Sequence, residues 1–267
     1  MTPHDLLPRM TADDGITDAL RRWLRAVDEP HQAAVMLEYL DMRDRMRAAQ
    51  RAVTSLEHAA ATHATIDGAI EEQRASDPDA AGVSCRAGCA ACCHIPVSVT
   101  RAEGALVRAA AARAGVKLDK QRLRLQARHG EDWQALPLEQ RRCTLLGDDN
   151  HCRVYDHRPG VCRKYHVASE PALCDTVSHP GARVLVWVVP IAEAAQSAAV
   201  TVWGQLTLAD ALLGNTRKQG CRMRKRAHKA LARPCQMPTL ANSVTDASQE
   251  HTCTLRTSNG PRKSGIW

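Results

Sequence analysis

The sequence lacks the apolar segments that would place it in or across a membrane. Its first ten residues, Met-Thr-Pro-His-Asp-Leu-Leu-Pro-Arg-Met, contain no apolar core of the kind that a secretory signal needs. The longest strongly apolar stretch, residues 184–192, is far too short to span a bilayer and contains Pro190. These absences predict a cytoplasmic protein with no membrane span. Because cytoplasmic thiols stay reduced, a framework of disulfides is not expected.

Aromatic residues are also scarce, since Phe is absent and only five Trp and three Tyr occur. Ala is abundant, which favours helix. Apolar residues recur at three- and four-residue spacing over residues 16–28 and again over 31–75, which predicts a long N-terminal helical segment. We expect any bend in the second stretch near residues 59–65 or at Gly68. A chain of 267 residues can bury a core and does not need a metal merely because it is small.

Further elements are expected along the rest of the chain. Thr100 and Glu103 have the spacing of a capping box, so a helix should start there and end at Gly115. Residues 140–180 have no helical or strand period, and the turn-like Asp148-Asp149-Asn150 lies among them. The other expected elements are helices at 119–129, 191–200 and 207–213 and one short strand at 183–189. The predicted fold class is mainly α, with a small irregular Cys-rich knot packed on helices.

Charge and composition suggest three regions: an N-terminal helical extension at 1–80, a Cys-cluster domain at 81–214 and a basic tail at 215–267, predicted to be disordered. Residues 217–267 hold 11 Lys and Arg against 2 Asp and Glu, whereas the preceding residues hold 25 against 27. The tail could bind polyanions weakly, and the N-terminal helices could serve as a surface for a protein partner.

Cysteines are the richest source of chemistry, because eight of the eleven fall between residues 85 and 174. Residues 85–93 read Cys-Arg-Ala-Gly-Cys-Ala-Ala-Cys-Cys. Thiolates this dense hold a metal or an iron–sulfur cluster, form disulfides or do redox chemistry. Cysteines two or three residues apart can turn both sulfurs toward one ion. The candidate metal ligands are Cys85, Cys89, Cys92, Cys93, Cys143, Cys152 and Cys162, for Zn²⁺ or for Fe, including a 4Fe–4S cluster.

Several alternatives stay open within this set. The candidates exceed the four ligands of one site, so either spare cysteines pack as small hydrophobes or two sites exist. Cys92 and Cys93 are adjacent, so both can serve one centre only if the backbone turns sharply. Cys174 is an additional candidate, and nearby histidines could substitute as ligands: His94, His151, His157 and His166. Arg158 and Arg163 are expected to offset the negative charge of the thiolates, and Tyr155 and Tyr165 to pack over the site.

The wider pattern resembles a known family. After the first four cysteines come Cys143-Thr-Leu-Leu-Gly-Asp-Asp-Asn-His-Cys152 and then Tyr155, Arg158-Pro159, and Cys162-Arg-Lys-Tyr165. This string is similar to the zinc- or iron-chelating cysteine-cluster family, the CxxCxxCC or YkgJ-type proteins, with one extra residue between the first two cysteines. The resemblance covers residues 85–165 and implies zinc or iron binding. Flagellin lysine N-methylases have a similar cluster and are more distant relatives.

Function classes follow from these observations. The first is a metal-binding protein whose centre is structural or stores metal; the second is an iron–sulfur enzyme such as a protein lysine N-methylase-like transferase. The third is an adaptor whose helices bind a partner. The spacing of Cys85, Cys89 and Cys92 also resembles that of radical S-adenosylmethionine enzymes, but those need many alternating strands and helices, and only one strand is expected here. No nucleophile–base pair, phosphate loop or paired carboxylates stand out, so the enzyme question stays open.

Overall fold

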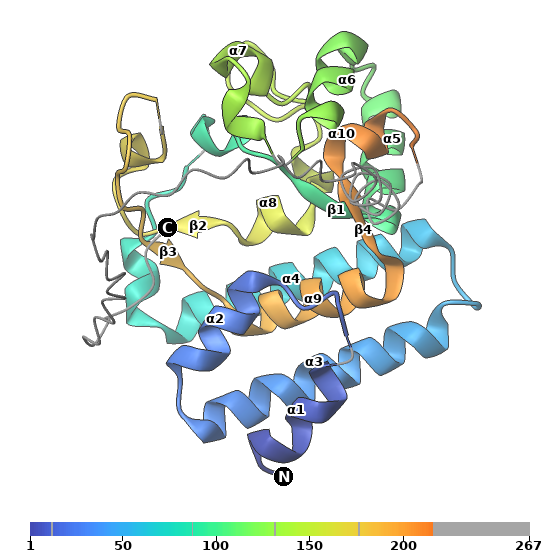
Figure 1. Cartoon of the computed structure of the whole chain (residues 1–267), viewed down its shortest axis with the longest axis vertical. Helices are drawn as coiled ribbons and strands as arrows, with labels where there is room; N and C mark the ends of the chain where they lie inside the picture. The colour runs from blue at the N-terminus through green and yellow to red at the C-terminus, as the bar shows by residue number, and fades with distance from the viewer. Residues whose placement is uncertain (12, 87, 131, 176, 216–267) are drawn as a thin grey trace, which may run out of the picture. The chain divides into compact units, whose positions relative to one another are not determined.

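The computed structural model describes residues 1–11, 13–86, 88–130, 132–175 and 177–215 (Figure 1). This part of the chain confirms the expected mainly-α class, with ten α-helices and two two-stranded sheets. The helices are α1 (Pro3–Thr11), α2 (Asp18–Ala26), α3 (Glu29–Ala49), α4 (Ser55–Ser76), α5 (Arg101–Arg113), α6 (Lys120–Arg128), α7 (Leu138–Arg141), α8 (Gly160–Lys164), α9 (Pro190–Trp203) and α10 (Leu208–Leu212). All of the predicted tail except Asn215 lies outside the described residues.

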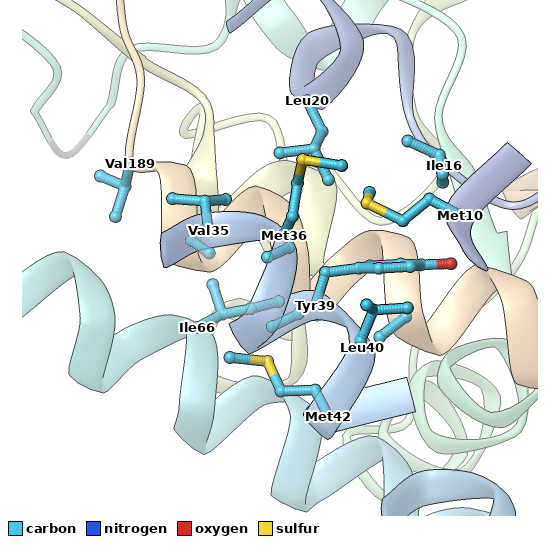
Figure 2. Packing of buried hydrophobic residues seen from close by; sticks show 14 of the residues in the cluster. Met10, Ile16, Leu20, Val35, Met36, Tyr39, Leu40, Met42, Ile66 and Val189 are labelled. Carbon is cyan, nitrogen blue, oxygen red and sulfur yellow. The ribbon is translucent and has the colours of Figure 1, made fainter. Parts of the chain in front are cut away.

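The first core is built by the N-terminal helices together with α9. Helix α9 contacts both α3 and α4, and α1 packs on α3 (Figure 1). Figure 2 shows Met10 and Leu40 on either side of the Tyr39 ring, and the Tyr39 side chain is fully buried. The apolar face of residues 16–28 is buried as expected, since Ile16 and Leu20 belong to this core. The N-terminal helices therefore bury their apolar faces against a helix that follows the cysteines in the sequence.

The long stretch predicted at 31–75 is two helices, because the chain breaks between Ala49 and Ser55. Thr54 accepts a hydrogen bond from the N–H of Glu57, and the Glu57 carboxylate accepts one from the N–H of Thr54. This capping box starts α4 and is worth about 1 kcal/mol of helix stability. Residues 59–65 and Gly68, where a bend was expected, both lie inside α4.

The second core lies under the cysteine segment. Strands β1 (Ser98–Thr100) and β4 (Gln205–Thr207) pair antiparallel, with Val99 opposite Leu206, and α5, α6 and α10 pack around them. The predicted capping box at Thr100 and Glu103 is confirmed, and Gly115 follows α5 with a φ of 64°. The predicted helices near 119–129, 191–200 and 207–213 are α6, α9 and α10.

The region expected to be irregular is mostly turns. It holds α8 and two 3-10 turns, η4 (Tyr155–His157) and η5 (Pro171–Cys174), and it is preceded by the 3-10 turn η3 (Trp133–Ala135) and by α7, which ends at Arg141. Strand β2 (His166–Val167) pairs antiparallel with β3 (Val186–Trp187), which is shorter than the strand predicted at 183–189. Among the described helices, none is long and apolar enough to cross a membrane.

Candidate metal centre

The first four cysteines lie on a sharply turning segment. Cys85 and Cys89 precede the 3-10 turn η2 (Ala91–His94), which carries Cys92 and Cys93. The neighbouring Cys93 thiol raises the pKa of the Cys92 thiol, and burial raises it further. The 3-10 turn is the sharp backbone turn that both residues would need to serve one centre. The Sγ of Cys85 accepts a hydrogen bond from the N–H of Val167 at 3.3 Å, which joins this segment to β2.

Cys143 and Cys152 come from a second loop that lies against the first. The N–H of Cys143 donates to the carbonyl of Cys93 at 2.8 Å. Cys152 forms an antiparallel bridge with Leu146, and the chain reverses between them at Asn150, whose φ is 60°. Asp148-Asp149-Asn150 is thus a turn, as the sequence suggested, and its geometry brings Cys152 back toward Cys143.

Cys162 lies on the short helix α8. Its N–H donates to the carbonyl of Pro159 at 2.9 Å, within the first turn of this helix. Helix α8 packs against α4 and α9, so the thiol is carried into the molecule from a third segment. Burial raises the pKa of the Cys162 thiol, and the neighbouring thiols of Cys143 and Cys92 raise it further.

The thiols form two adjoining groups that share Cys92. Cys143, Cys152 and Cys162 are electrostatic neighbours of Cys92 on one side, and Cys85, Cys89 and Cys174 on the other. Burial is the main cause of the raised pKa of Cys143 and of Cys174, each at about 11, and nearby thiols contribute. Neighbouring thiolates in a buried site repel each other, so they need a nearby cation to stay ionised. Metal ions such as zinc bind thiolates tightly and can supply that charge.

Arg158 supplies a fixed positive charge to this cluster. Its guanidinium lowers the pKa of the Cys92, Cys152 and Cys162 thiols against the larger raising effects. The guanidinium carbon lies 3.9 Å from the centroid of the Tyr155 ring, and Nε is buried without a hydrogen-bond partner. The predicted placement of Arg158 beside the thiols is confirmed.

A comparison with known families finds a match to the cysteine segment. Residues 84–179 match the family model CxxCxxCC, described as a putative zinc- or iron-chelating domain. The match covers about a third of the chain, and we refer to these residues as the CxxCxxCC domain. No curated protein matches the chain. No solved structure matches it either. The match includes every candidate ligand and extends to Cys174, beyond the span over which the sequence resemblance was recognised.

Cys174 lies within the CxxCxxCC domain on η5, which packs against η2. It neighbours the thiols of Cys89 and Cys85, although 81 residues separate it from Cys93 in the sequence. The sequence offered Cys174 as an additional candidate on proximity alone and did not indicate which thiols it would join. The pairing of β2 with β3 carries the chain back to it.

Arg163 does not neutralise the thiolates of the domain, which corrects one expectation. Its Nη1 pairs with Asp67 of α4 at 2.5 Å, and its Nη2 donates to the carbonyl of Asp156. The side chain is buried and ties α8 to α4. The sequence around Arg163 gave no sign of this ion pair, because Asp67 lies 96 residues earlier in the chain.

Some of the aromatic and histidine candidates lie beside the thiols, and others make contacts elsewhere. Tyr165 neighbours Cys174, Cys92 and Cys85, and burial together with these thiols raises the pKa of its hydroxyl to about 12. Tyr155 is more than half exposed, so its contact with the site is through Arg158. His94 and His151 bond to backbone carbonyls of their own turns, those of Ala90 and Asp149.

His166 lies on strand β2 and is half-buried. Its Nδ1 is buried without a partner, and its ring meets the edge of Trp187 at 5.9 Å between centroids. Burial lowers the pKa of His166 to about 4, and the charges of Arg74 and Arg158 lower it further. The ring is therefore neutral at physiological pH, the form in which a histidine can act as an acceptor or ligand.

Sequence reasoning missed Glu103 as a residue of this domain's framework. Its carboxylate is fully buried and accepts hydrogen bonds from the N–H of Thr100 at 2.8 Å, the N–H of Gly160 at 2.7 Å and Nε2 of His63 at 3.2 Å. Burial would raise the pKa of Glu103, but these hydrogen bonds lower it overall. The capping-box spacing predicted the bond to Thr100 and carried no information on the bond to Gly160.

The donor set fits zinc or iron in its chemistry. The thiols of the domain are free and half-buried, and thiolates are the ligands of structural zinc and of iron–sulfur clusters. Within the ranges that the structure describes, no three Cys, His, Asp or Glu side chains are already close enough together to hold a metal ion. Metal binding would therefore remove the protons of the thiols that bind and draw their sulfurs together.

A small cavity of about 30 Å³ adjoins the thiols of Cys93 and Cys143. Its walls are largely apolar and include Pro96, Val97 and Trp133. A space of this size holds one or two water molecules, far less than a typical substrate pocket of several hundred Å³.

Proposed function

We propose that the CxxCxxCC domain of this chain binds zinc or iron through thiolates of Cys85, Cys89, Cys92, Cys93, Cys143, Cys152 and Cys162, and that the metal holds the domain's turns together. The observation that carries this is the approach of cysteines from three separate segments around Cys92. These segments contain little regular structure, so a metal crosslink would add stability where backbone pairing is sparse.

The number of metal ions follows from the division of the thiols into two groups. One four-thiolate site would use only part of the set, whereas two sites would use both groups, with Cys174 in the second. Metal analysis of protein purified without oxygen gives the number of ions per chain. Visible absorption distinguishes an iron–sulfur cluster, which is coloured, from zinc, which is not.

The same measurement tests the proposal itself. Near-stoichiometric zinc or iron should survive dialysis, and removal by a chelator should lower the melting temperature, because metal binding is coupled to folding. A preparation that is metal-free, folded and insensitive to chelator would contradict the proposal. The comparisons lend no support to a methylase-like enzyme, and no described residue favours that alternative.

A cytoplasmic location is the remaining part of this proposal. All eight cysteines of the domain are free thiols, and metal binding by thiolates requires a reducing compartment. Titration of thiols in protein isolated under conditions that block exchange should find them reduced or metal-bound. Disulfides among them would contradict a cytoplasmic location.

A further inference from the structure

Positive charge is concentrated on one part of the folded chain. Residues 101–130 contain 8 Lys and Arg against 2 Asp and Glu, whereas the rest of residues 1–216 contains 17 against 25. Of the two acidic residues, Glu103 is buried and hydrogen-bonded. The other, Asp119, caps α6 and pairs with Arg122 at 3.5 Å. The remaining cations of this segment therefore have no acidic partner within it.

Three of these cations form a row on α6. Lys120, Arg124 and Arg128 are exposed and recur every four residues, so they share one face of the helix over about 12 Å. The contacts of the described residues include no ion pair for any of the three. We call these three residues the α6 ridge. The buried side of the helix carries Leu123, which belongs to the second core, and α10 packs against α6.

The neighbouring helix does not reverse the sign of this surface. Helix α7 packs against α6 and carries one acidic residue, Glu139, and one basic residue, Arg141. Arg141 bonds to the carbonyls of Gln134 and Leu136 and not to Glu139. The ridge therefore keeps its net positive charge in the folded protein.

The composition of residues 101–130 indicates which kind of polyanion the α6 ridge would bind. Residues 101–130 contain no Phe, Tyr or Trp, so they offer no platform for stacking unpaired bases. None of the large exposed hydrophobic residues lies in this segment, so it lacks the side chains that insert into a bilayer. Cations at regular spacing without aromatic or apolar companions suit contact with phosphates. We propose that the α6 ridge binds the phosphate backbone of duplex nucleic acid without reading its base sequence.

The test measures binding of the full chain to a short random-sequence DNA duplex, to an RNA duplex of the same sequence and to phosphatidylserine vesicles over a range of salt. The ridge variant is Lys120→Gln/Arg124→Gln/Arg128→Gln. Loss of three phosphate contacts should reduce the slope of log K against log salt by about 2.7, at about 0.9 for each contact. Affinity at low salt should fall at least about tenfold. The basic tail is present in both proteins, so its contribution cancels.

The control removes the same charge from exposed positions on other elements, through Arg25→Gln/Arg51→Gln/Arg183→Gln. Duplex binding close to that of the unmodified chain in the control, with loss in the ridge variant, supports the proposal. Equal loss in both variants, or no loss in the ridge variant, overturns it. Ridge-dependent binding to vesicles and to neither duplex overturns it as well. Unchanged metal content and melting temperature establish that the variants fold, and Arg124→Gln alone, expected to lower the slope by about 0.9, repeats the test with a smaller change.

Discussion

The carboxylate of Glu103 accepts a hydrogen bond from the backbone N–H of Gly160 at 2.7 Å, across 57 residues of sequence. The same carboxylate caps the start of α5 through the N–H of Thr100. Gly160 opens α8, the helix that carries Cys162. The sequence around Glu103 predicts only the start of a helix, yet Glu103 also holds in place a segment that is proposed to bind metal.

Substitution of Glu103 should therefore damage both stability and metal binding. Glu103→Ala leaves four donors without their acceptor, namely the N–H groups of Thr100 and Gly160 and the Nε2 atoms of His63 and Gln196, and should lower the free energy of unfolding by about 3 kcal/mol. Metal content after dialysis should also fall, because Gly160 is no longer held. Glu57 is the matched control, since it occupies the same capping-box position at the start of α4 but is exposed. Glu57→Ala should cost about 1 kcal/mol and leave metal content unchanged. Equal metal retention in the two variants would show that Glu103 has no part in positioning α8.

Gly160 tolerates no side chain, for reasons of space. A Cβ at Gly160 would lie 2.0 Å from Oε1 of Gln196 and 2.8 Å from Cδ1 of Ile66. Gly160→Ala should therefore push α8 away from α4 and α9 and cost about 1–3 kcal/mol by overpacking. Gly68→Ala is the control, because nothing lies within 4 Å of a Cβ there. It should stabilise the protein by up to about 1 kcal/mol, since Ala is the better helix former. Thermal unfolding of both variants tests the pair, and an unaltered Gly160→Ala protein would refute the close packing of α8.

Local chemistry predicted the elements whose start and end are encoded nearby. Thr100 and Glu103 identified the start of α5, and Gly115 its end. The break between α3 and α4 was missed, although Thr54 and Glu57 have the same capping-box spacing, because the apolar stripe on either side was read as continuous. The pairing of β2 with β3 could not be predicted from local patterns, because strands of two residues are too short to show an alternation of apolar and polar residues.

At the candidate site too, the sequence predicted the types of side chain but not all of their contacts. The density of cysteines predicted a cluster and a guanidinium beside it, and Arg158 is that guanidinium. Nothing near Arg163 in the sequence distinguished it from Arg158, yet Arg163 turns to Asp67 on α4. Which thiols become neighbours also depends on tertiary structure, as Cys174 and Cys89 illustrate. Spacing identifies ligand types, whereas the packing of α8, η2 and η5 decides which of them meet.

The minimal ligand set predicted from the sequence is Cys89 and Cys92 of the first segment with Cys152 and Cys162, the two cysteines on either side of the Tyr155 to Pro159 turn. Cys92 is the thiol that the two groups share, so this set takes Cys89 from one group and Cys152 and Cys162 from the other. Single Cys→Ser changes at these positions should remove most of the metal and lower the melting temperature, because each ligand is lost from a site coupled to folding. The controls are the same change at the tail cysteines, which lie outside the described residues: Cys221, Cys235 and Cys253. The tail variants should keep both properties. Equal metal content in all seven variants, measured by elemental analysis, would reject this set.

A buried ion pair in the first core gives a prediction that is independent of metal. Asp13 accepts hydrogen bonds from Nη1 of Arg43 at 2.5 Å, from the hydroxyl of Tyr39 at 2.9 Å and from Nη2 of Arg47 at 3.0 Å. Asp13 and Arg43 are both buried. Asp13→Asn removes the buried carboxylate that pairs with Arg43 and leaves only Asp44, which is half exposed and lies 2.8 Å from Nη2 of Arg43. The change should cost about 2–3 kcal/mol, with the metal content of the folded fraction unchanged.

The dependence on pH follows from the pKa of Asp13. Burial alone would raise that pKa, but the hydrogen bonds from Arg43 and Tyr39 lower it below the ordinary value of 3.8. A carboxylate with a lowered pKa contributes its full stability above the unfolded value and loses it as pH falls through the folded value. Asp13→Asn should therefore weaken the folded state most at neutral pH, and the difference from the unmodified chain should shrink below about pH 4. Denaturant unfolding at several pH values measures this difference, and a gap that stays constant down to pH 2 would mean that Asp13 is not the ionised partner of Arg43.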